Sequence, residues 1–394
     1  MRFYVASTIV FACIANTATG QNASFQGIGD LPGGLFFSTA QDISRDGSTI
    51  VGDSSSYNSY FAEAVKWTAT GGLEPLGLLP GHNQSTAFGV SPRGNWVVGE
   101  SVLSPEHVEA FAWSQETGTF GLGDLPGGRF RSIARAVSRN GRVIVGSASV
   151  EIDGRTAGAP FRWTPETGME SLGYLGGTRR SGSASDVTPD GSVIVGSVSI
   201  DVGVGTAFRW TEAGGMVGLG DLPGGVDQSS ARAVSADGRW IVGTGSSESM
   251  SGGTESQAVR WNEFGEIEGL GFLPGESFGR YSRASDVSDD GQMVVGTAYS
   301  SGYDGGAHAV LWTPNEGIRT IESILLDYGI DIAAEGWVRL SSASGISGDG
   351  RTIAGTGGVQ GLGTQGWVVT LPIPAPTTLA PLAAMGLLGM RRRR

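Results

Sequence analysis

A unit of about fifty residues recurs seven times along this chain, and its most complete copy runs from Gly121 to Gly168. Each copy carries a Val-Gly or Ala-Gly step after a tight turn, at Gly52, Gly99, Gly146, Gly196, Gly243, Gly296 and Gly355. In six copies a tryptophan then ends the next apolar segment, at Trp67, Trp113, Trp163, Trp210, Trp261 and Trp312; in the seventh, Trp367 comes two positions early. A period near fifty is typical of a four-stranded propeller blade rather than of a helical repeat.

Four short strands are predicted within each unit. Strand one, such as Ser132 to Val137, ends in an Asn-Gly or Asp-Gly turn that tolerates positive φ and matches the twist of a hairpin. Strand two, such as Val143 to Val145, is apolar throughout, which is typical of a strand covered on both faces. Strand three alternates around Phe161 to Trp163, and we expect its tryptophan in the core between blades. Strand four is Met169 to Gly173.

The count of strands predicts how the chain closes. A strand four stands alone at residues 25–29, six units then run from strand one to strand four, and the chain ends on strand three near Trp367 to Thr370. Unpaired strands at both ends would expose backbone donors and acceptors, so we expect them to pair. The predicted fold is therefore an all-β, seven-bladed β-propeller of four-stranded antiparallel blades, closed by the N-terminal strand.

One segment, residues 320–340, breaks the period. Ile321, Ile324, Leu325 and Tyr328 are at helical spacing, and Gly329 can end the helix. This pattern predicts one short helix near 320–329. We interpret it as an amphipathic helix that covers one end of the ring; a lid over a ligand is the alternative.

The two termini differ from the repeats. Residues 1–20 begin with Arg2, continue as an apolar run and end in small residues, which predicts a secretory signal. Residues 371–394 begin with three closely spaced prolines (Pro372, Pro374 and Pro376), continue as an apolar run and end in four arginines. The run is short for a membrane span, so residues 371–390 predict a transient membrane association or a sorting signal. The repeats occupy residues 21–370.

Charge and cysteine content exclude several functions. Five arginines and no acids lie in the two terminal segments, so 21 of the 26 basic residues remain against 38 acidic ones, a net charge of −17. Such a surface repels phosphate backbones and argues against nucleic-acid binding. The single cysteine, Cys13, lies in the signal, so the repeat domain has no disulfide and no cysteine metal site.

The connections between strands two and three vary most from copy to copy, at 53–62, 100–109, 147–158, 197–205, 244–257 and 297–308. The Leu-Pro-Gly-Gly corners, at 31–34, 125–128 and 222–225, are expected at the same end of each blade. Variation on one rim is typical of a scaffold that presents a binding face. Serine, glycine and acidic residues dominate there, which suits a polar ligand. We call this end of the ring the variable rim.

Three aspartates, Asp42, Asp186 and Asp286, occupy one equivalent position of strand one, where the other copies carry glycine or alanine. Near a ring axis three carboxylates could hold a divalent cation, and they are the candidate metal ligands of this chain. We favour the alternative that each carboxylate accepts hydrogen bonds from neighbouring backbone in a crowded position. The histidines, His82, His107 and His308, occupy unrelated repeat positions, so their spacing indicates neither a zinc site nor a triad. The sequence predicts no catalytic residue and no cofactor.

The recurring order Leu-Gly-Asp-Leu-Pro-Gly-Gly, Ala-x-Ala-Val-Ser-x-Asp-Gly, Val-Gly and Ala-Phe-Arg-Trp resembles the HAF-family extracellular repeats over about residues 25–370. The last segment resembles the PEP-CTERM sorting tail, with Ala375 where the usual glutamate stands. The positions that match it are Pro374, Ala375, Pro376, Thr377, Arg391, Arg392, Arg393 and Arg394. These resemblances imply export, processing by a sorting enzyme of the exosortase type, transient anchoring in the inner membrane, and retention at the cell surface or in the extracellular matrix.

Together these features predict an exported, non-catalytic repeat scaffold that binds an extracellular polymer, such as a polysaccharide, or a surface protein through the variable rim. Two alternatives remain open. One is a secreted carbohydrate-active enzyme on the same ring, which needs two carboxylates that flank a groove. The other is a purely structural matrix protein. Convergent carboxylates or a cation at the channel mouth would favour the enzyme.

Overall fold

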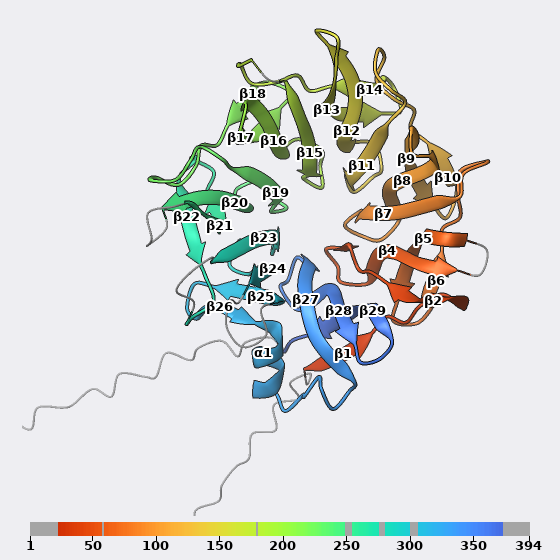
Figure 1. Cartoon of the computed structure of the whole chain (residues 1–394), viewed down its shortest axis with the longest axis vertical. Coiled ribbons are helices and arrows are strands. Elements are labelled where there is room, and N and C mark those ends of the chain that lie inside the picture. The colour runs from red at the N-terminus through yellow and green to blue at the C-terminus, as the bar shows by residue number, and fades with distance from the viewer. Residues whose placement is uncertain are drawn as a thin grey trace, which may run out of the picture.

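The strands predicted as strand one lie closest to the centre of the molecule (Figure 1). The computed structural model describes residues 23–372 except 57–58, 179, 249–253, 276–279 and 300–305, and omits the side chains of 59–61. The inner strands are β3 (Asp42–Ile43), β7 (Gln84–Val90), β11 (Ser132–Val137), β15 (Ser181–Val187), β19 (Ser230–Val234), β23 (Tyr281–Val287) and β27 (Trp337–Ile346). Each contacts the next in this order, and β27 contacts β3.

The second and third strands of each repeat form long hairpins. The second strands are β4 (Thr49–Ser56), β8 (Trp96–Ser104), β12 (Ile144–Ile152), β16 (Ile194–Asp201), β20 (Ile241–Glu248), β24 (Val294–Tyr299) and β28 (Thr352–Val359). The third strands are β5 (Ser59–Thr68), β9 (His107–Ser114), β13 (Arg155–Thr164), β17 (Val204–Thr211), β21 (Thr254–Trp261), β25 (Ala307–Thr313) and β29 (Gly363–Thr370).

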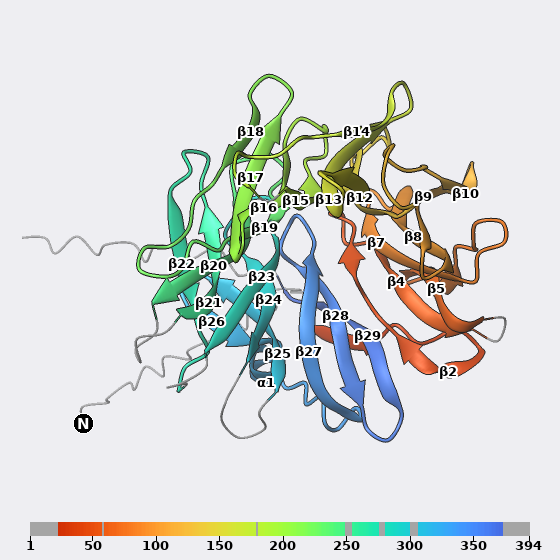
Figure 2. The same cartoon turned by 45° about the horizontal axis from the view of Figure 1, so that its top comes forward.

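The outer strands are short. They are β6 (Gly72–Pro75), β10 (Gly118–Gly121), β14 (Gly168–Ser171), β18 (Gly215–Gly218), β22 (Ile267–Gly271), β26 (Gly317–Thr320) and β1 (Ser24–Gly27). Within a repeat the order is one-two-three-four and antiparallel, as in β11-β12-β13-β14. An additional strand, β2 (Gly33–Ser38), pairs with β4 and with β29. Four-stranded antiparallel sheets set side by side around a centre make this an all-β propeller (Figures 1 and 2).

The inner turns show why serine and aspartate or asparagine recur with glycine. In β11 to β12, the Ser138 hydroxyl accepts the N–H of Val143 at 3.0 Å and donates to Asn140 Oδ1. The same Oδ1 accepts the N–H of Arg142 at 3.0 Å, and Gly141 has φ 72°. The side chains therefore satisfy the turn's own donors and hold it in the conformation that glycine permits.

The glycine of each second strand has a packing role that the repeat pattern alone does not explain. A Cβ on Gly146 would collide with the carbonyl oxygen of Ile133 on β11, and the equivalent glycines face the equivalent carbonyls. The inner strand approaches because it carries a β-bulge, between Ala134 and Ala136 in this copy. The Val-Gly step is thus required by a close backbone approach.

The N-terminal strand pairs with the last one, as the sequence predicts. Phe25 of β1 faces Val369 of β29, and Gly27 faces Trp367, in an antiparallel register. The Phe25 ring also meets the Trp337 ring edge-on at 5.3 Å. This pairing joins residues more than three hundred positions apart in the sequence.

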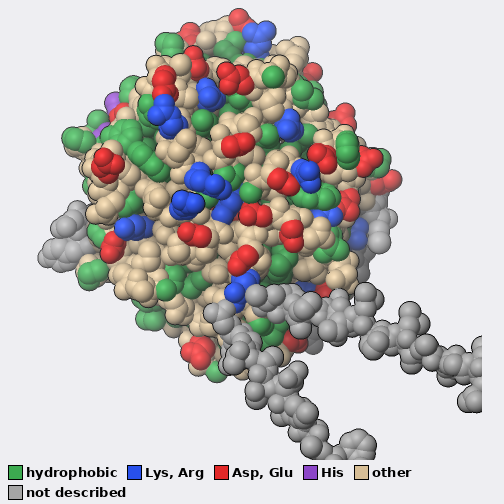
Figure 3. Space-filling view, turned by 180° about the vertical axis from the view of Figure 1, so that it is seen from behind, with side chains coloured by type: hydrophobic (Ala, Val, Ile, Leu, Met, Phe, Trp, Pro, Cys, Tyr) green, Lys and Arg blue, Asp and Glu red, His purple; other side chains and the backbone are tan. Residues whose placement is uncertain are grey.

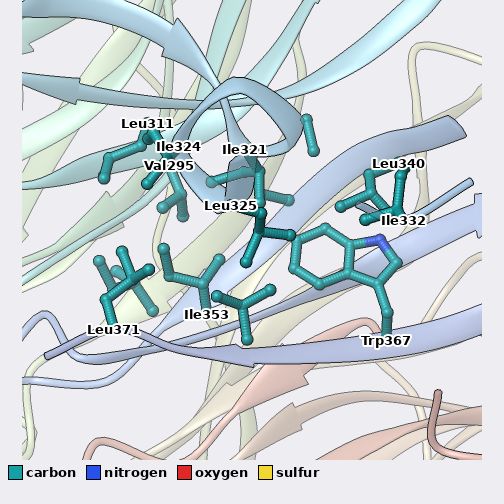
Figure 4. Close-up of a cluster of buried hydrophobic side chains, with 14 of the residues drawn as sticks. Val295, Leu311, Ile321, Ile324, Leu325, Ile332, Leu340, Ile353, Trp367 and Leu371 are labelled. Atoms are coloured by element: carbon teal, nitrogen blue, oxygen red, sulfur yellow. The ribbon is translucent and has the colours of Figure 1, made fainter. Parts of the chain in front are cut away.

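The predicted helix is present as α1 (Ile321–Asp327). The Thr320 side chain accepts the N–H of Ser323 and caps its first turn. Ile321, Ile324 and Leu325 are buried and pack against Trp367 and neighbouring strands (Figure 4). The helix contacts β25, β26 and β27 and lies at the outer edge of the ring (Figure 1), so it packs against two adjacent sheets and does not cover one end of the ring as we interpreted it. Tyr328, counted among its apolar positions, instead lies past its last turn and is exposed.

Two expectations need correction or refinement. The connections predicted at 147–158 and its equivalents are largely strand, because β12 and β13 extend to the turn at Asp153 and Gly154, whose φ values of 52° and 72° suit a two-residue hairpin. Strand-three tryptophans are core at Trp261 and Trp367, which are fully buried, but Trp163 is only half-buried.

The signal predicted at 1–20 and the sorting motif at 374–377 and 391–394 lie outside the described residues. Within the part of the chain that the structure describes, no helix has the length and apolarity needed to cross a membrane.

Candidate functional site

A cavity of about 400 Å³ lies at the centre of the ring, and every inner strand or its flanking segment contributes to its wall. The β-bulges determine which side chains enter it. In each bulge the register skips one residue, which is Arg135 in β11, Ser185 in β15, Arg232 in β19 and Ser285 in β23, and all four line the cavity. Bulges re-aim side chains in this way next to binding and active sites.

The three candidate metal ligands line the cavity but have a structural role. Asp186 accepts the N–H of Val187 at 2.7 Å with Oδ1 and the N–H of Val234, on the next inner strand, at 2.8 Å with Oδ2. Asp42 and Asp286 bridge their inner strands to the following ones in the same way, at Val90 and Ile346. Among the described residues the three carboxylates do not come within ligand distance of one another. Each aspartate thus connects two adjacent sheets, as the backbone-capping interpretation predicts.

Arg45 lies among these carboxylates. It follows β3 and spans to distant repeats, where it donates to the carbonyl of Val234 at 2.5 Å and to Asp289 at 2.6 Å. Although burial lowers the pKa of Arg45, the carboxylates of Asp286, Asp186 and Asp289 raise it overall. At this end of the cavity the positive charge of Arg45 is therefore compensated by nearby carboxylates.

Burial raises the pKa of all three aspartates, although each of these residues is only half-buried by surface area. For Asp186 the value is about 7, with Arg45 acting in the opposite direction. For Asp42 the negative charge of Asp286 adds to burial and raises the pKa further. Carboxylates with raised pKa values are common at functional sites, but here their oxygens are occupied by backbone N–H groups.

The other end of the cavity is basic. Arg135, Arg232 and Arg283 all line it. In the described part of the chain no hydrogen bond or ion pair reaches the guanidinium of Arg232 or Arg283, and Arg283 Nε is buried without a partner. Burial lowers the pKa of Arg232 to about 10, and the charges of Arg283 and Arg135 contribute. Glu100 partly offsets the burial of Arg135.

A second cavity of about 700 Å³ continues from this basic end toward the variable rim. It shares Arg232, Arg283 and three serines with the first, and its wall is rich in hydroxyl groups. Tyr281, at the start of β23, and Thr254, at the start of β21, mark where it reaches the rim. Its one acid, Glu255, lies 2.6 Å from the guanidinium of Arg280. The arginines are therefore approached from the variable rim.

Sequence reasoning missed these arginines because strand one was treated as a regular alternating strand. A usable signal was present: arginine recurs at one position before the Ala-Val pair, at 135 and 232, in a domain that is otherwise acidic. The spacing of the histidines in the sequence also did not predict their proximity. His82 and His107, at unrelated repeat positions, lie with ring centroids 5.8 Å apart.

On the opposite face from that of Figure 1, acidic and basic side chains are interspersed, and blue side chains gather near the middle (Figure 3). Basic side chains therefore cluster locally on this face, although the net charge of the protein is negative.

No family model matches this sequence, and no curated protein matches it. Solved structures with a similar fold include TolB from Acinetobacter baumannii, at 13% identity and a TM-score of 0.45, covering 70% of this chain and 63% of that one. A putative TolB from Agrobacterium tumefaciens shows 15% identity and a TM-score of 0.42, covering 77% and 94%. The β-propeller domain of the Trilobed protease from Pyrococcus furiosus shows 13% and 0.47, covering 78% and 84%.

Proposed function

We propose that this chain is a seven-bladed propeller, closed by β1, that works as an exported, non-catalytic scaffold and binds an anionic extracellular polymer. The ring is supported by the pairing of β1 with β29 and by the contact of β27 with β3, which returns the series of inner strands to its start. The resemblance to HAF repeats and to the PEP-CTERM tail supports export and retention at the cell surface by a sorting enzyme.

The observation that carries the ligand class is the pair Arg232 and Arg283, with which no acid among the described residues forms a hydrogen bond or ion pair, inside a cavity that reaches the variable rim. Holding unpaired cations together in a partly desolvated cavity costs stability. A carboxylate or sulfate group offsets this cost, since guanidinium groups bind such groups through paired hydrogen bonds. The surrounding serines suit a ligand that also carries hydroxyl groups, as a polysaccharide does.

A non-catalytic role is supported by the state of the cavity acids. Glycoside cleavage requires one carboxyl group that donates a proton and a second that acts as base or nucleophile. In Asp42, Asp186 and Asp286 both oxygens accept backbone N–H groups from two adjacent strands. Neither oxygen is free to approach a substrate without breaking the contact between sheets.

The test is binding of the purified full-length chain to polygalacturonate, an anionic polymer, and to a neutral glucan, with product release measured in parallel. The Arg232→Gln/Arg283→Gln variant removes both charges, and Arg142→Gln is the matched control because Arg142 is exposed and paired with Glu166 outside the cavity. We expect binding to the anionic polymer only, a rise in Kd of tenfold or more in the double variant, and no change in the control. Equal binding by the double variant, or release of reducing ends, would refute the proposal.

A further inference from the structure

His82, His107 and Glu109 form a compact group outside the central cavity. His82 lies in the corner after Leu79-Pro80-Gly81, at a position where three other corners carry glycine (Gly34, Gly128 and Gly225), and its N–H donates to the carbonyl of Leu79. His107 begins β9, and Glu109 follows two residues later on the same face of the strand. One ligand atom from each of the three side chains lies within 4.8 Å of the other two.

The donor set is that of a transition-metal site. Two imidazoles and one carboxylate form a known three-ligand set for zinc, with a fourth position left for water or a ligand. Metal–ligand bonds of ~2.0–2.2 Å place tetrahedral ligand atoms roughly 3.4 Å apart, so closure requires a shift of about 1 Å, within the reach of side-chain rotation.

Further contacts orient these ligands. His82 Nδ1 is buried without a hydrogen-bond partner, which is costly unless something outside the chain binds it. The His107 ring stacks on Phe130 with centroids 4.3 Å apart. Glu109 Oε1 accepts the N–H of Gly123 at 3.2 Å, a contact of the kind that positions metal-binding carboxylates.

The charges around the group favour a cation. Asp124 lies close enough to His107 and Glu109 for both to act on its pKa, which burial raises overall. Its carboxylate oxygens accept the N–H groups of Leu125 and Arg131, which keep it in place beside the site. A second carboxylate near the three ligands increases the attraction for a divalent ion.

We propose that His82, His107 and Glu109 bind one divalent transition-metal ion of the zinc class. The site occurs in a single repeat and uses no residue of the central cavity, so it goes beyond the proposed function and does not depend on it. The ion would join the corner at His82 to strand β9 and leave one coordination position open near the variable rim.

The test is titration of the purified full-length chain with zinc chloride by calorimetry, and with cobalt chloride by visible absorption, which reports tetrahedral coordination. We expect one ion per chain, and a loss of affinity of at least tenfold in His82→Ala and in His107→Gln. His308→Ala is the control, because this third histidine lies beside Glu322 and α1.

Thermal unfolding without metal shows whether each variant retains its fold. Both substitutions lie at the end of the sheet that faces the variable rim, since His82 is in a corner and His107 begins β9. If His82→Ala melts early, Glu109→Gln provides a second ligand change of nearly constant shape. Saturable zinc binding that depends on these residues and is kept by His308→Ala supports the site. Absence of saturable binding, or equal affinity in the ligand variants and the wild type, overturns it.

Discussion

Replacing Asp186 by asparagine tests the account of the central cavity most directly. Its carboxylate accepts one N–H from its own strand and one from the next sheet, and burial raises its pKa to about 7. Asparagine has almost the same shape but keeps one acceptor and does not titrate. The Asp186→Asn variant therefore changes both the contact between sheets and the pH dependence of stability.

The magnitude follows from linkage. An aspartate in an unfolded chain has a pKa of about 3.9, and the folded value is about 7, a difference of about 3 units or up to ~4 kcal/mol. Because the folded pKa is the higher one, the contribution is fully present below about pH 4 and is lost as the pH rises through about 7. Because Asp186 is only half-buried by surface area, solvent reduces the effect, and we expect ~2–3 kcal/mol.

The assay is urea unfolding of wild type and variant at several pH values between about pH 4 and about pH 8. Near the acidic limit the wild type should be the more stable protein, because asparagine leaves one buried N–H without an acceptor, at a cost of ~1–3 kcal/mol. This advantage should shrink steadily toward neutral pH. Glu170→Gln, at an exposed position of β14, is the control and should not alter the pH profile.

One outcome would show the reasoning to be wrong. If the difference between wild type and Asp186→Asn is the same at every pH, Asp186 ionises in the folded protein as it does in the unfolded chain. Burial would then not raise the pKa of Asp186, and the cavity would not desolvate this carboxyl group.

Three further substitutions test the ring itself. Phe25→Ala removes the ring that packs on Trp337 and should lower the free energy of unfolding by ~2–3 kcal/mol; a loss below about 0.5 kcal/mol in urea titration would contradict the pairing of β1 with the last sheet. Ser132→Ala removes the hydroxyl that accepts the buried N–H of Ala110 at 2.9 Å on the preceding blade and should cost ~1–3 kcal/mol; an unchanged melting temperature would argue against this contact. Gly141→Ala forces a side chain onto a residue with φ 72° and against a tryptophan ring, so we expect a loss of at least ~1–2 kcal/mol, measured by the urea midpoint, and a neutral substitution would show that the turn adopts another conformation.

Much of the architecture was predictable because it rests on local rules repeated seven times. The Asn140-Gly141 turn, the apolar second strands and a lone N-terminal strand are visible in the sequence. The structure contains each of them and pairs the N-terminal strand with the last one. The helix α1 lies in the segment that breaks the repeat, but it too was predictable from a local pattern, since Ile321, Ile324 and Leu325 form one apolar face. The aspartates of strand one were correctly interpreted as backbone caps because glycine and alanine replace them in other repeats.

The candidate sites depended on tertiary structure. Bulges in β11 and β19 direct Arg135 and Arg232 into the cavity, and bulges arise from how neighbouring strands pair, which alternation of residue types does not encode. Arg45 reaches Asp289, and His82 reaches His107, only because the ring brings distant or differently placed residues together. The sequence by itself determined the repeating four-stranded sheet, which follows from short-range patterns, and the pairing of its first strand with its last, which follows from the count of strands. The tertiary structure decided which charged side chains meet inside the ring, because residues far apart in the sequence come together only in the folded chain.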